Sequence, residues 1–284
     1  MTKITASAAG TITLGDLTVN RMGYGAMRLT GRGIWGEPRD PEGARRVLRR
    51  AVELDVNFID TADSYGPEVS ERLIREALWP YPADLVIATK GGLLRDGPDL
   101  WRPDRRPSHL RQALEGSLKR LGLERIDLYQ FHRPDPAVPY EESIGELVRL
   151  KNEGKIRHIG VSNVNEAQLG HALALTEIVS VQNRYNLSDR ASEGVLEQCE
   201  SLGKAFLPWY ALAASQLTRA GNRLEQVASE HGATPGQLAL AWLLARSPVM
   251  LPIPGTSSVE HLEENIAAVA IRLSPHDVEL FAAA

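Results

Sequence analysis

Four side chains of the sequence have the types that carbonyl chemistry needs, and each follows or ends a short apolar run. Asp60 and Tyr65 come after "VNFI", Lys90 ends "LVIATK", and His132 ends "LYQFH". An ammonium near a phenol stabilises the phenolate and lowers the phenol pKa, and a carboxylate holds the ammonium in place. A histidine adds a second hydrogen bond to a reacting oxygen. The set therefore favours protonation of the oxyanion that forms when a carbonyl group is reduced.

Each of these side chains also has an ordinary structural explanation. A lysine at a strand end is usually solvated, a histidine beside prolines is more often structural, and a tyrosine before a glycine can be a turn aromatic. Their joint placement at the ends of successive strands favours a shared chemical role. Two other chemistries are disfavoured, because the sequence has no HExxH pair or clustered cysteines to bind zinc and no GxSxG elbow for serine catalysis. We therefore expect no metal site.

The elements that must position these residues alternate between short apolar runs and amphipathic helices. The runs recur at roughly the 30-residue spacing of one strand–helix unit. Eight such units favour a closed (β/α)8 TIM barrel. A doubly wound open sheet is the rival, but it usually has fewer units and a glycine-rich first turn, which "GYGAM" is not. The eight runs are RMGYGAM, NFIDTAD, LVIATKGG, IDLYQFH, RHIGVSN, IVSVQNRY, AFLPWYAL and VMLPIPG.

End signals support several of the helices. Asp40 and Thr234 each precede a proline, as helix N-caps commonly do, and Gly154 and Gly203 stand where a glycine commonly ends a helix.

Two flanking features extend the barrel. Residues 11–20, TITLGDLTVN, predict an N-terminal β-hairpin, and the stretches SVEHLEENIAAVA and SPHDVELFAAA predict extra C-terminal helices. Because no linker separates these features from the barrel, we expect a single domain over residues 1–284.

The composition disfavours several classes of protein. The chain has 284 residues, of which 43% are hydrophobic and 24% charged, and its formal net charge is −4, so we expect neither nucleic acid nor a membrane as partner. The N-terminus lacks the apolar core of a signal peptide and no apolar run approaches ~20 residues, which favours a cytoplasmic protein. The single cysteine, Cys199, excludes an intrachain disulfide and is expected to be buried in a helix.

Several motifs, in the expected order over essentially the whole chain, resemble those of the aldo-keto reductase superfamily. They are NFIDTADSYGPEVSERLIREAL, IATKGG, GKIRHIGVSN and LPIPGTSSVEHLEENIAAV. The resemblance implies a small-molecule carbonyl substrate, reduced by hydride transfer from NADPH, and a monomeric protein. It also implies a catalytic tetrad in which Asp60 fixes Lys90, Tyr65 donates the proton and His132 binds the substrate oxygen. Asp63 and Ser64 are then expected to shape the turn and cap the next helix.

The resemblance further implies a nicotinamide cofactor that lies extended across the barrel mouth. Trp209 stands where the family usually has a tyrosine on the nicotinamide ring. Gly255 replaces a lysine and His261 an arginine that many relatives have, so we expect NADPH with a weakened preference over NADH. The matching cofactor-binding positions are Gly25, Ala26, Met27, Asp60, Ser162, Asn163, Gln182, Trp209, Ala211, Leu212, Gly255, Thr256, Ser257, His261, Glu264 and Asn265.

The substrate itself is not predicted by the sequence, because loops after the strands form the pocket walls. Trp35 and Trp101 lie in two such loops and favour apolar or aromatic carbonyl compounds, although packing is an alternative role. The arginines of the second loop either attract an anionic substrate or are simply solvated; they are Arg95, Arg102, Arg105 and Arg106. Residues 211–226 are short for a loop that covers the cofactor, which indicates an open site.

Two other functions remain open at this point. A redox-sensing regulatory subunit would keep the fold and the cofactor site while turning over little substrate, but an intact tetrad argues against it. An unrelated barrel isomerase would explain neither the tetrad nor "PIPGTSS".

Overall fold

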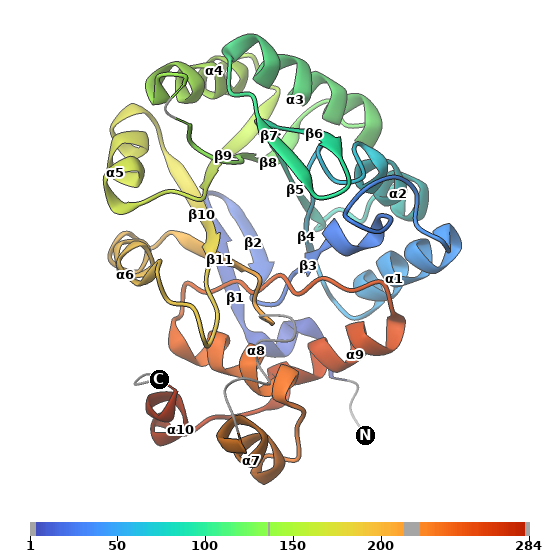
Figure 1. Ribbon diagram of the computed structural model, residues 1–284, viewed down its shortest axis with the longest axis vertical. Coiled ribbons are helices and arrows are strands. Elements are labelled where there is room, and N and C mark those ends of the chain that lie inside the picture. The colour runs from blue at the N-terminus through green and yellow to red at the C-terminus, as the bar shows by residue number, and fades with distance from the viewer. Residues whose placement is uncertain (1–3, 136, 213–221, 282–284) are drawn as a thin grey trace.

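Seven parallel strands form the sheet that carries the polar residues described above. The computed structural model describes residues 4–135, 137–212 and 222–281. The strands follow one another in the order β3, β4, β5, β8, β9, β10, β11, and every neighbouring pair is parallel. Viewed down the shortest axis, they curl around a centre with the helices outside (Figure 1). Their bounds are Tyr24–Gly25, Phe58–Asp60, Val86–Gly91, Ile126–Phe131, Ile156–Ser162, Ile178–Arg184 and Ala205–Trp209.

The eighth predicted strand, VMLPIPG, is an extended segment without regular strand pairing, so this part of the prediction is wrong. Residues 249–254 still join the two outer strands. Gly23 N–H donates to Pro252 O on one side, and Leu251 N–H donates to Phe206 O on the other, both at 2.9 Å. Pro252 and Pro254 have no N–H group, so this segment cannot form a full ladder. It nevertheless completes the (β/α)8 barrel.

Helices cover the outside of the sheet as the alternating pattern predicts (Figure 1). The predicted N-caps are confirmed, because Asp40 accepts a hydrogen bond from Gly43 N–H and Thr234 accepts one from Gln237 N–H. The α-helices α1 to α10 span Pro41–Glu53, Val69–Leu78, Pro107–Leu121, Tyr140–Asn152, Glu166–Leu175, Glu193–Leu202, Asn222–Glu230, Pro235–Arg246, Val259–Ala267 and Pro275–Leu280. Short 3-10 helices span Ala6–Ala9 (η1), Ala26–Leu29 (η2) and Ala268–Ala270 (η4).

Gly203 ends α6 and Gly154 follows α4, both with positive φ, as their positions predict. The buried side chain of Cys199 in α6 also agrees with its prediction, and burial raises the pKa of this thiol to about 12.

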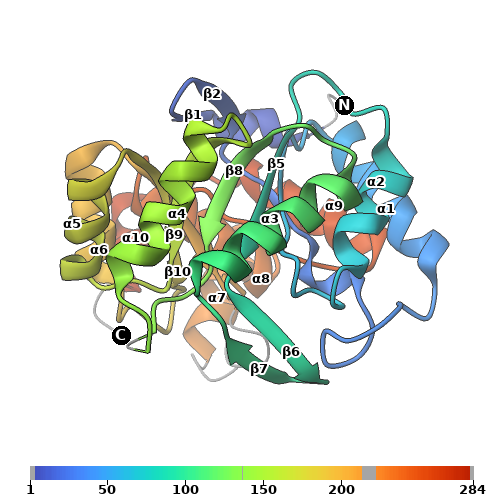
Figure 2. The same cartoon turned by 90° about the horizontal axis from the view of Figure 1, so that it is seen from above.

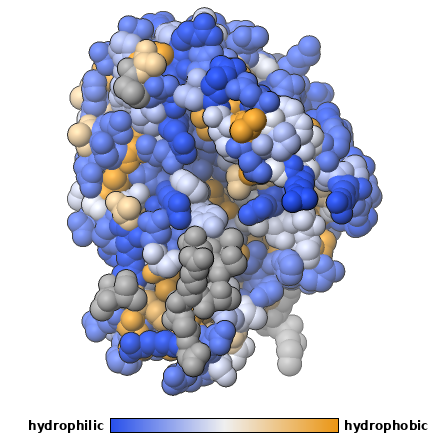
Figure 3. Space-filling model, in the orientation of Figure 1, coloured by the Kyte–Doolittle hydropathy of each residue, from blue (hydrophilic) through white to orange (hydrophobic). Residues whose placement is uncertain are grey.

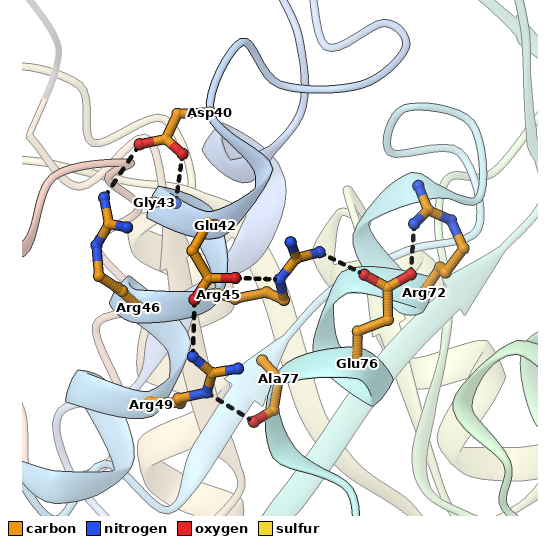
Figure 4. Close-up of polar contacts among 9 residues, drawn as sticks. All are labelled: Asp40, Glu42, Gly43, Arg45, Arg46, Arg49, Arg72, Glu76 and Ala77. Carbon is orange, nitrogen blue, oxygen red and sulfur yellow. Dashed lines mark hydrogen bonds and ion pairs between the residues drawn. The ribbon is translucent and has the colours of Figure 1, made fainter.

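A surface network of charges joins the first two helices of the barrel (Figure 4). The Arg45 guanidinium bridges Glu42 of its own helix at 2.8 Å and Glu76 of α2 at 2.7 Å. Arg72 binds the other oxygen of Glu76 at 2.6 Å, and Arg49 binds the other oxygen of Glu42 at 2.9 Å. The network fixes α1 beside α2, whose preceding loop carries Tyr65.

Two β-hairpins lie on opposite sides of the barrel (Figure 2). The first, β1 (Thr11–Leu14) with β2 (Leu17–Asn20), was predicted from its alternating pattern and is confirmed. The second, β6 (Leu93–Gly97) with β7 (Leu100–Pro103), forms where the sequence indicated only a loop. Because it follows β5 directly, this second hairpin stands beside the mouth of the barrel.

No helix among residues 4–135, 137–212 and 222–281 is long and apolar enough to cross a membrane.

Candidate active site

A buried ion pair lies at the centre of the candidate site. Lys90 has an exposed fraction of 0% and Asp60 of 3%, and their Nζ and Oδ2 atoms are 2.7 Å apart. Nζ also donates to Thr61 O at 2.8 Å and to the Tyr65 hydroxyl at 3.2 Å. All three ammonium hydrogens therefore have acceptors, and one of them is the tyrosine oxygen. The strand ends bring these side chains together as the sequence predicts.

The pKa of the Tyr65 hydroxyl is raised above its ordinary value, which corrects the expectation of a lowered one. Burial is the largest cause, because it disfavours the phenolate; the nearby charge of Lys90 opposes this effect, and Asp60 adds to it. Burial also disfavours the charge of Lys90, but Asp60 and Tyr65 outweigh it and raise the lysine pKa. At neutral pH the site therefore holds a charged lysine beside a neutral phenol that has a proton to donate.

His132 is a neutral imidazole in this environment. Burial and the charges of Lys90, Arg133 and Arg105 hold its pKa well below the ordinary value. Its Nδ1 atom is buried without a hydrogen-bond partner among the described residues, and its ring stands edge-on to Tyr65 with the centroids 6.1 Å apart. The Nε2 edge is then the one that a substrate oxygen can approach.

Two glutamine amides complete the surroundings of the Asp60 carboxylate. Gln130 Nε2 and Gln182 Nε2 donate to Asp60 Oδ1 at 2.9 and 2.8 Å. With Lys90 on the other oxygen, the carboxylate accepts three hydrogen bonds, which suits a buried charge. Gln130 took no part in the sequence-based prediction, since its position inside β8 does not distinguish it from a packing residue.

A second polar cluster lies at the ends of the next strands. Trp209 Nε1 donates to Asn163 Oδ1 at 3.1 Å, and Asn163 Nδ2 donates to Ser162 Oγ at 2.9 Å and to His132 O at 3.0 Å. Asn163 adopts the left-handed backbone region, with φ of 57°, which turns its amide toward these partners. The indole thus orients the amide, a contact that a phenol at this position would make with different geometry.

These clusters open into one cavity of about 470 Å³ at the barrel mouth. The space-filling view shows a hollow near the centre of this face (Figure 3). Thirteen of the sequence-predicted site residues line it: Gly25, Met27, Asp60, Tyr65, Trp101, His132, Ser162, Asn163, Gln182, Trp209, Ala211, Leu212 and Gly255.

The other predicted site residues lie outside the lining of this cavity. Ala26 and Lys90 are fully buried behind it, and Trp35 stands at the surface. Thr256, Ser257, His261, Glu264 and Asn265 belong to α9 and the segment before it. Within this group Glu264 accepts a hydrogen bond from Thr234 Oγ1 of the α8 cap at 2.6 Å, a contact that fastens one helix to the other.

The predicted open loop over residues 211–226 falls largely on residues 213–221, which lie outside the described residues.

Sequence reasoning missed two arginines that line the cavity, Arg28 and Arg133. Neither guanidinium has an acceptor among the residues that the structure describes. Arg28 follows Met27 in η2, and its Cγ would lie 3.6 Å from a Cβ placed on Gly255. The signal was available, since each arginine directly follows a residue that had been assigned to the site.

The expectation that Asp63 and Ser64 cap the next helix is wrong. The N-cap of α2 is Glu68, in a left-handed conformation and without a side-chain cap. Asp63 Oδ1 and Ser64 Oγ are instead buried without partners among the described residues. Burial, followed by the charge of Glu71, raises the pKa of Asp63 well above its ordinary value.

The four arginines of the second loop already have hydrogen-bond acceptors, so they do not form a free set for binding an anion. Arg102 pairs with Asp96 at 2.9 Å and Arg106 with Asp104 at 2.6 Å. Arg105 pairs with Asp135 and is buried. Arg95 bonds only to backbone carbonyl groups, as described below.

The chain resembles one family model and many known proteins, among them the following two relatives and one solved structure. The model of the aldo/keto reductase family matches residues 21–284. An uncharacterized oxidoreductase of Schizosaccharomyces pombe is 54% identical over 271 residues, which cover 95% of this chain and 88% of the relative. Pyridoxine 4-dehydrogenase of Escherichia coli is 44% identical, with 94% of this chain and 95% of the relative covered. The structure of an aldo-keto reductase from Klebsiella pneumoniae in complex with NADPH superposes with a TM-score of 0.82 at 25% identity, over 96% of this chain and 94% of that one.

Proposed function

The chain belongs to the aldo/keto reductase family and is an oxidoreductase of carbonyl and alcohol groups, and we propose that it reduces an aldehyde or ketone to the alcohol with NADPH. The observation that carries the proposal is the hydrogen-bonded chain from Asp60 through Lys90 to Tyr65, which ends in the cavity beside His132. A neutral phenol in contact with a buried ammonium is suited to protonating an oxyanion.

The atoms left free in the second polar cluster fit a nicotinamide carboxamide. Ser162 Oγ accepts a hydrogen bond from Asn163, so its own hydroxyl hydrogen remains to be donated. Gln182 Nε2 is bound to Asp60, so its Oε1 atom remains an acceptor. A primary carboxamide has an oxygen that accepts and an NH2 group that donates, so the free hydroxyl hydrogen of Ser162 and the free Oε1 of Gln182 can bind one of each. Trp209 provides an aromatic face beside them.

Each residue of the tetrad then has its own role in the reaction. NADPH, when bound, supplies the hydride. His132 Nε2 and the Tyr65 hydroxyl orient the substrate oxygen by hydrogen bonds, and Tyr65 gives its proton to that oxygen as negative charge develops there. Lys90 stabilises the phenolate that remains, and Asp60 keeps Lys90 charged and in position.

The choice of NADPH rests on a relative and on charge. The Klebsiella pneumoniae protein was solved with NADPH. The guanidinium of Arg28, which has no acceptor among the described residues, lines the cavity beside Gly255, where a cation favours the phosphates of the cofactor. Because the Escherichia coli relative is a pyridoxine 4-dehydrogenase, pyridoxal belongs among the first carbonyl compounds to be assayed.

The test combines cofactor binding with turnover. Dissociation constants for NADPH and NADH come from protein fluorescence, and turnover comes from loss of nicotinamide absorbance with pyridoxal and a panel of aldehydes and ketones. Tyr65→Phe removes the proton donor, so kcat should fall by about 10² to 10⁴ while the NADPH dissociation constant changes less than about two-fold. Full turnover by the variant would contradict the role of Tyr65, and a wild-type protein that binds neither cofactor would contradict the proposal as a whole.

A further inference from the structure

Arg95 of β6 is a buried arginine whose five N–H groups all point at backbone carbonyl oxygens. The exposed fraction of Arg95 is 8%. Nη1 donates to Ile34 O at 2.6 Å and Ser64 O at 3.3 Å, and Nη2 donates to Gly33 O at 2.7 Å and Gly97 O at 3.2 Å. Nε donates to Leu100 O at 3.3 Å. The planar fork of a guanidinium is thus fully used.

These carbonyl groups come from three segments that meet at the barrel mouth. Residues 33–34 belong to the loop after β3, Ser64 directly precedes Tyr65, and residues 97 and 100 flank the turn of the β6–β7 hairpin. The hairpin turn also contacts the first loop directly, since Asp99 N–H donates to Gly33 O at 3.0 Å. A Cβ on Gly33 would lie 2.8 Å from Pro98 Cβ, so the two loops are in close contact. Arg95 therefore clamps the hairpin onto the segment that carries Tyr65.

No carboxylate of the described residues forms a hydrogen bond to Arg95. Burial accordingly lowers the pKa of its guanidinium, and the charge of Asp99 offsets this only in part. An apolar side chain would avoid the cost of burying a charge, but it would leave the five carbonyl groups without this donor. The planar cation also makes a further contact that no apolar side chain provides.

That contact is with an indole ring. The Arg95 guanidinium carbon lies 3.7 Å from the centroid of Trp101 and 5.8 Å from that of Trp35. Trp101 in turn meets Tyr65 edge-on, with the centroids 6.4 Å apart and the planes at 89°. Trp101 lines the cavity and yet is 36% exposed, so one face is held by the cation while other parts of the ring remain open.

We propose that Arg95 is a positioning residue that holds Trp101 as a fixed wall of the substrate pocket, and that the substrate carries a planar aromatic group that packs against this indole. This rests on the proposed function, because the cavity is assigned as the place where the carbonyl compound binds. A rigid aromatic wall next to Tyr65 favours flat, apolar groups, whose stacking needs no further ordering of the protein.

The test compares a bicyclic aromatic aldehyde with a small one. The wild type, Arg95→Lys, Trp101→Ala and the double variant are assayed with 2-naphthaldehyde and with propanal at saturating NADPH. Lysine keeps the charge but loses the planar fork. The matched control is Arg102→Lys, because Arg102 lies on the same hairpin and pairs with Asp96, whereas the guanidinium over the Trp101 ring is that of Arg95. Binding of 2-naphthaldehyde to the NADP+ complex, measured by equilibrium dialysis, provides a readout that does not need turnover.

Arg95→Lys should raise KM and the dissociation constant for 2-naphthaldehyde about five- to thirty-fold, and should change kcat/KM for propanal by a several-fold smaller factor. Trp101→Ala should do the same, and the double variant should be no worse than Trp101→Ala alone, because both changes remove one contact. Arg102→Lys should behave like wild type.

Three results would overturn the inference. These are equal effects of Arg95→Lys on both aldehydes, additive effects in the double variant, and loss of the folded state in both Arg95→Lys and Arg95→Met. If the wild type reduces propanal while the variants give any of these three results, the proposed function still stands. A wild type that reduces neither aldehyde, pyridoxal nor the wider panel refutes the proposed function, and the dialysis comparison still decides the role of Arg95.

Discussion

Replacing Asp60 with asparagine should destabilise the protein strongly and in a pH-dependent manner. The substitution removes the negative charge that lies 2.7 Å from the fully buried ammonium of Lys90. The new side chain can also turn its single oxygen either toward Lys90 or toward the amides of Gln130 and Gln182, but not toward both. Breaking a buried pair by removing one partner costs about 3–5 kcal/mol, which lowers the unfolding midpoint of a chain of this size by about 10 °C.

The pH dependence follows from the direction of the lysine pKa. In the wild type, the folded-state pKa of Lys90 is raised, so this group stabilises the fold below its unfolded pKa, about 10.4, and loses that contribution as pH rises through the folded value. In Asp60→Asn the main remaining effect is burial, which lowers the folded-state pKa below 10.4. The loss of stability should then be greatest at low pH and shrink as pH approaches 10.4.

Thermal unfolding at pH 6 and pH 9.5 measures both effects. Asp96→Asn is the control, because it removes the exposed partner of Arg102 and should leave the midpoint nearly unchanged. The reasoning is refuted if Asp60→Asn at pH 6 resembles this control, or if its deficit is the same at both pH values.

Two further predictions concern the cofactor end of the cavity. Gly25→Ala would place a Cβ 2.6 Å from Ile253 O. It should therefore lower the free energy of unfolding in urea by about 1–3 kcal/mol and weaken NADPH binding. Gly145→Ala in α4 has open space around it and should change neither quantity. Trp209→Phe removes the 3.1 Å hydrogen bond to Asn163 and should raise the NADPH dissociation constant about two- to ten-fold. Trp79→Phe at the surface should not change this constant. Equal dissociation constants for the two variants would show that the indole N–H does not orient the amide.

The sequence predicted the meeting of Asp60, Tyr65, Lys90 and His132 because parallel strands end on one side of a barrel. Each of these residues stands at or just after the end of a strand, so their order along the chain was enough to bring them together.

Other features depend on balances that no local pattern contains. The pKa of Tyr65 is set by burial against the charge of Lys90, and only the structure shows that burial is the larger effect. The acceptors of Arg95 are backbone carbonyls in three separate segments, and no residue type in the sequence indicates that a backbone carbonyl will be an acceptor. The irregular eighth segment is different, since Pro252 and Pro254 were visible in the sequence and argued against a regular strand.

The way in which the barrel closes also has a consequence for how the chain folds. Without residues 249–254, the sheet has two open edges, one at β3 and one at β11. The bond between Gly23 and Pro252 joins the first barrel strand to a segment near the end of the chain, so it belongs to the slowest class of contact to form. During synthesis from the N-terminus, the sheet stays open until residues 249–254 have been made, and until then both of its edges can pair with other chains. Chaperone dependence and aggregation of nascent chains should therefore be concentrated in the interval before this segment leaves the ribosome.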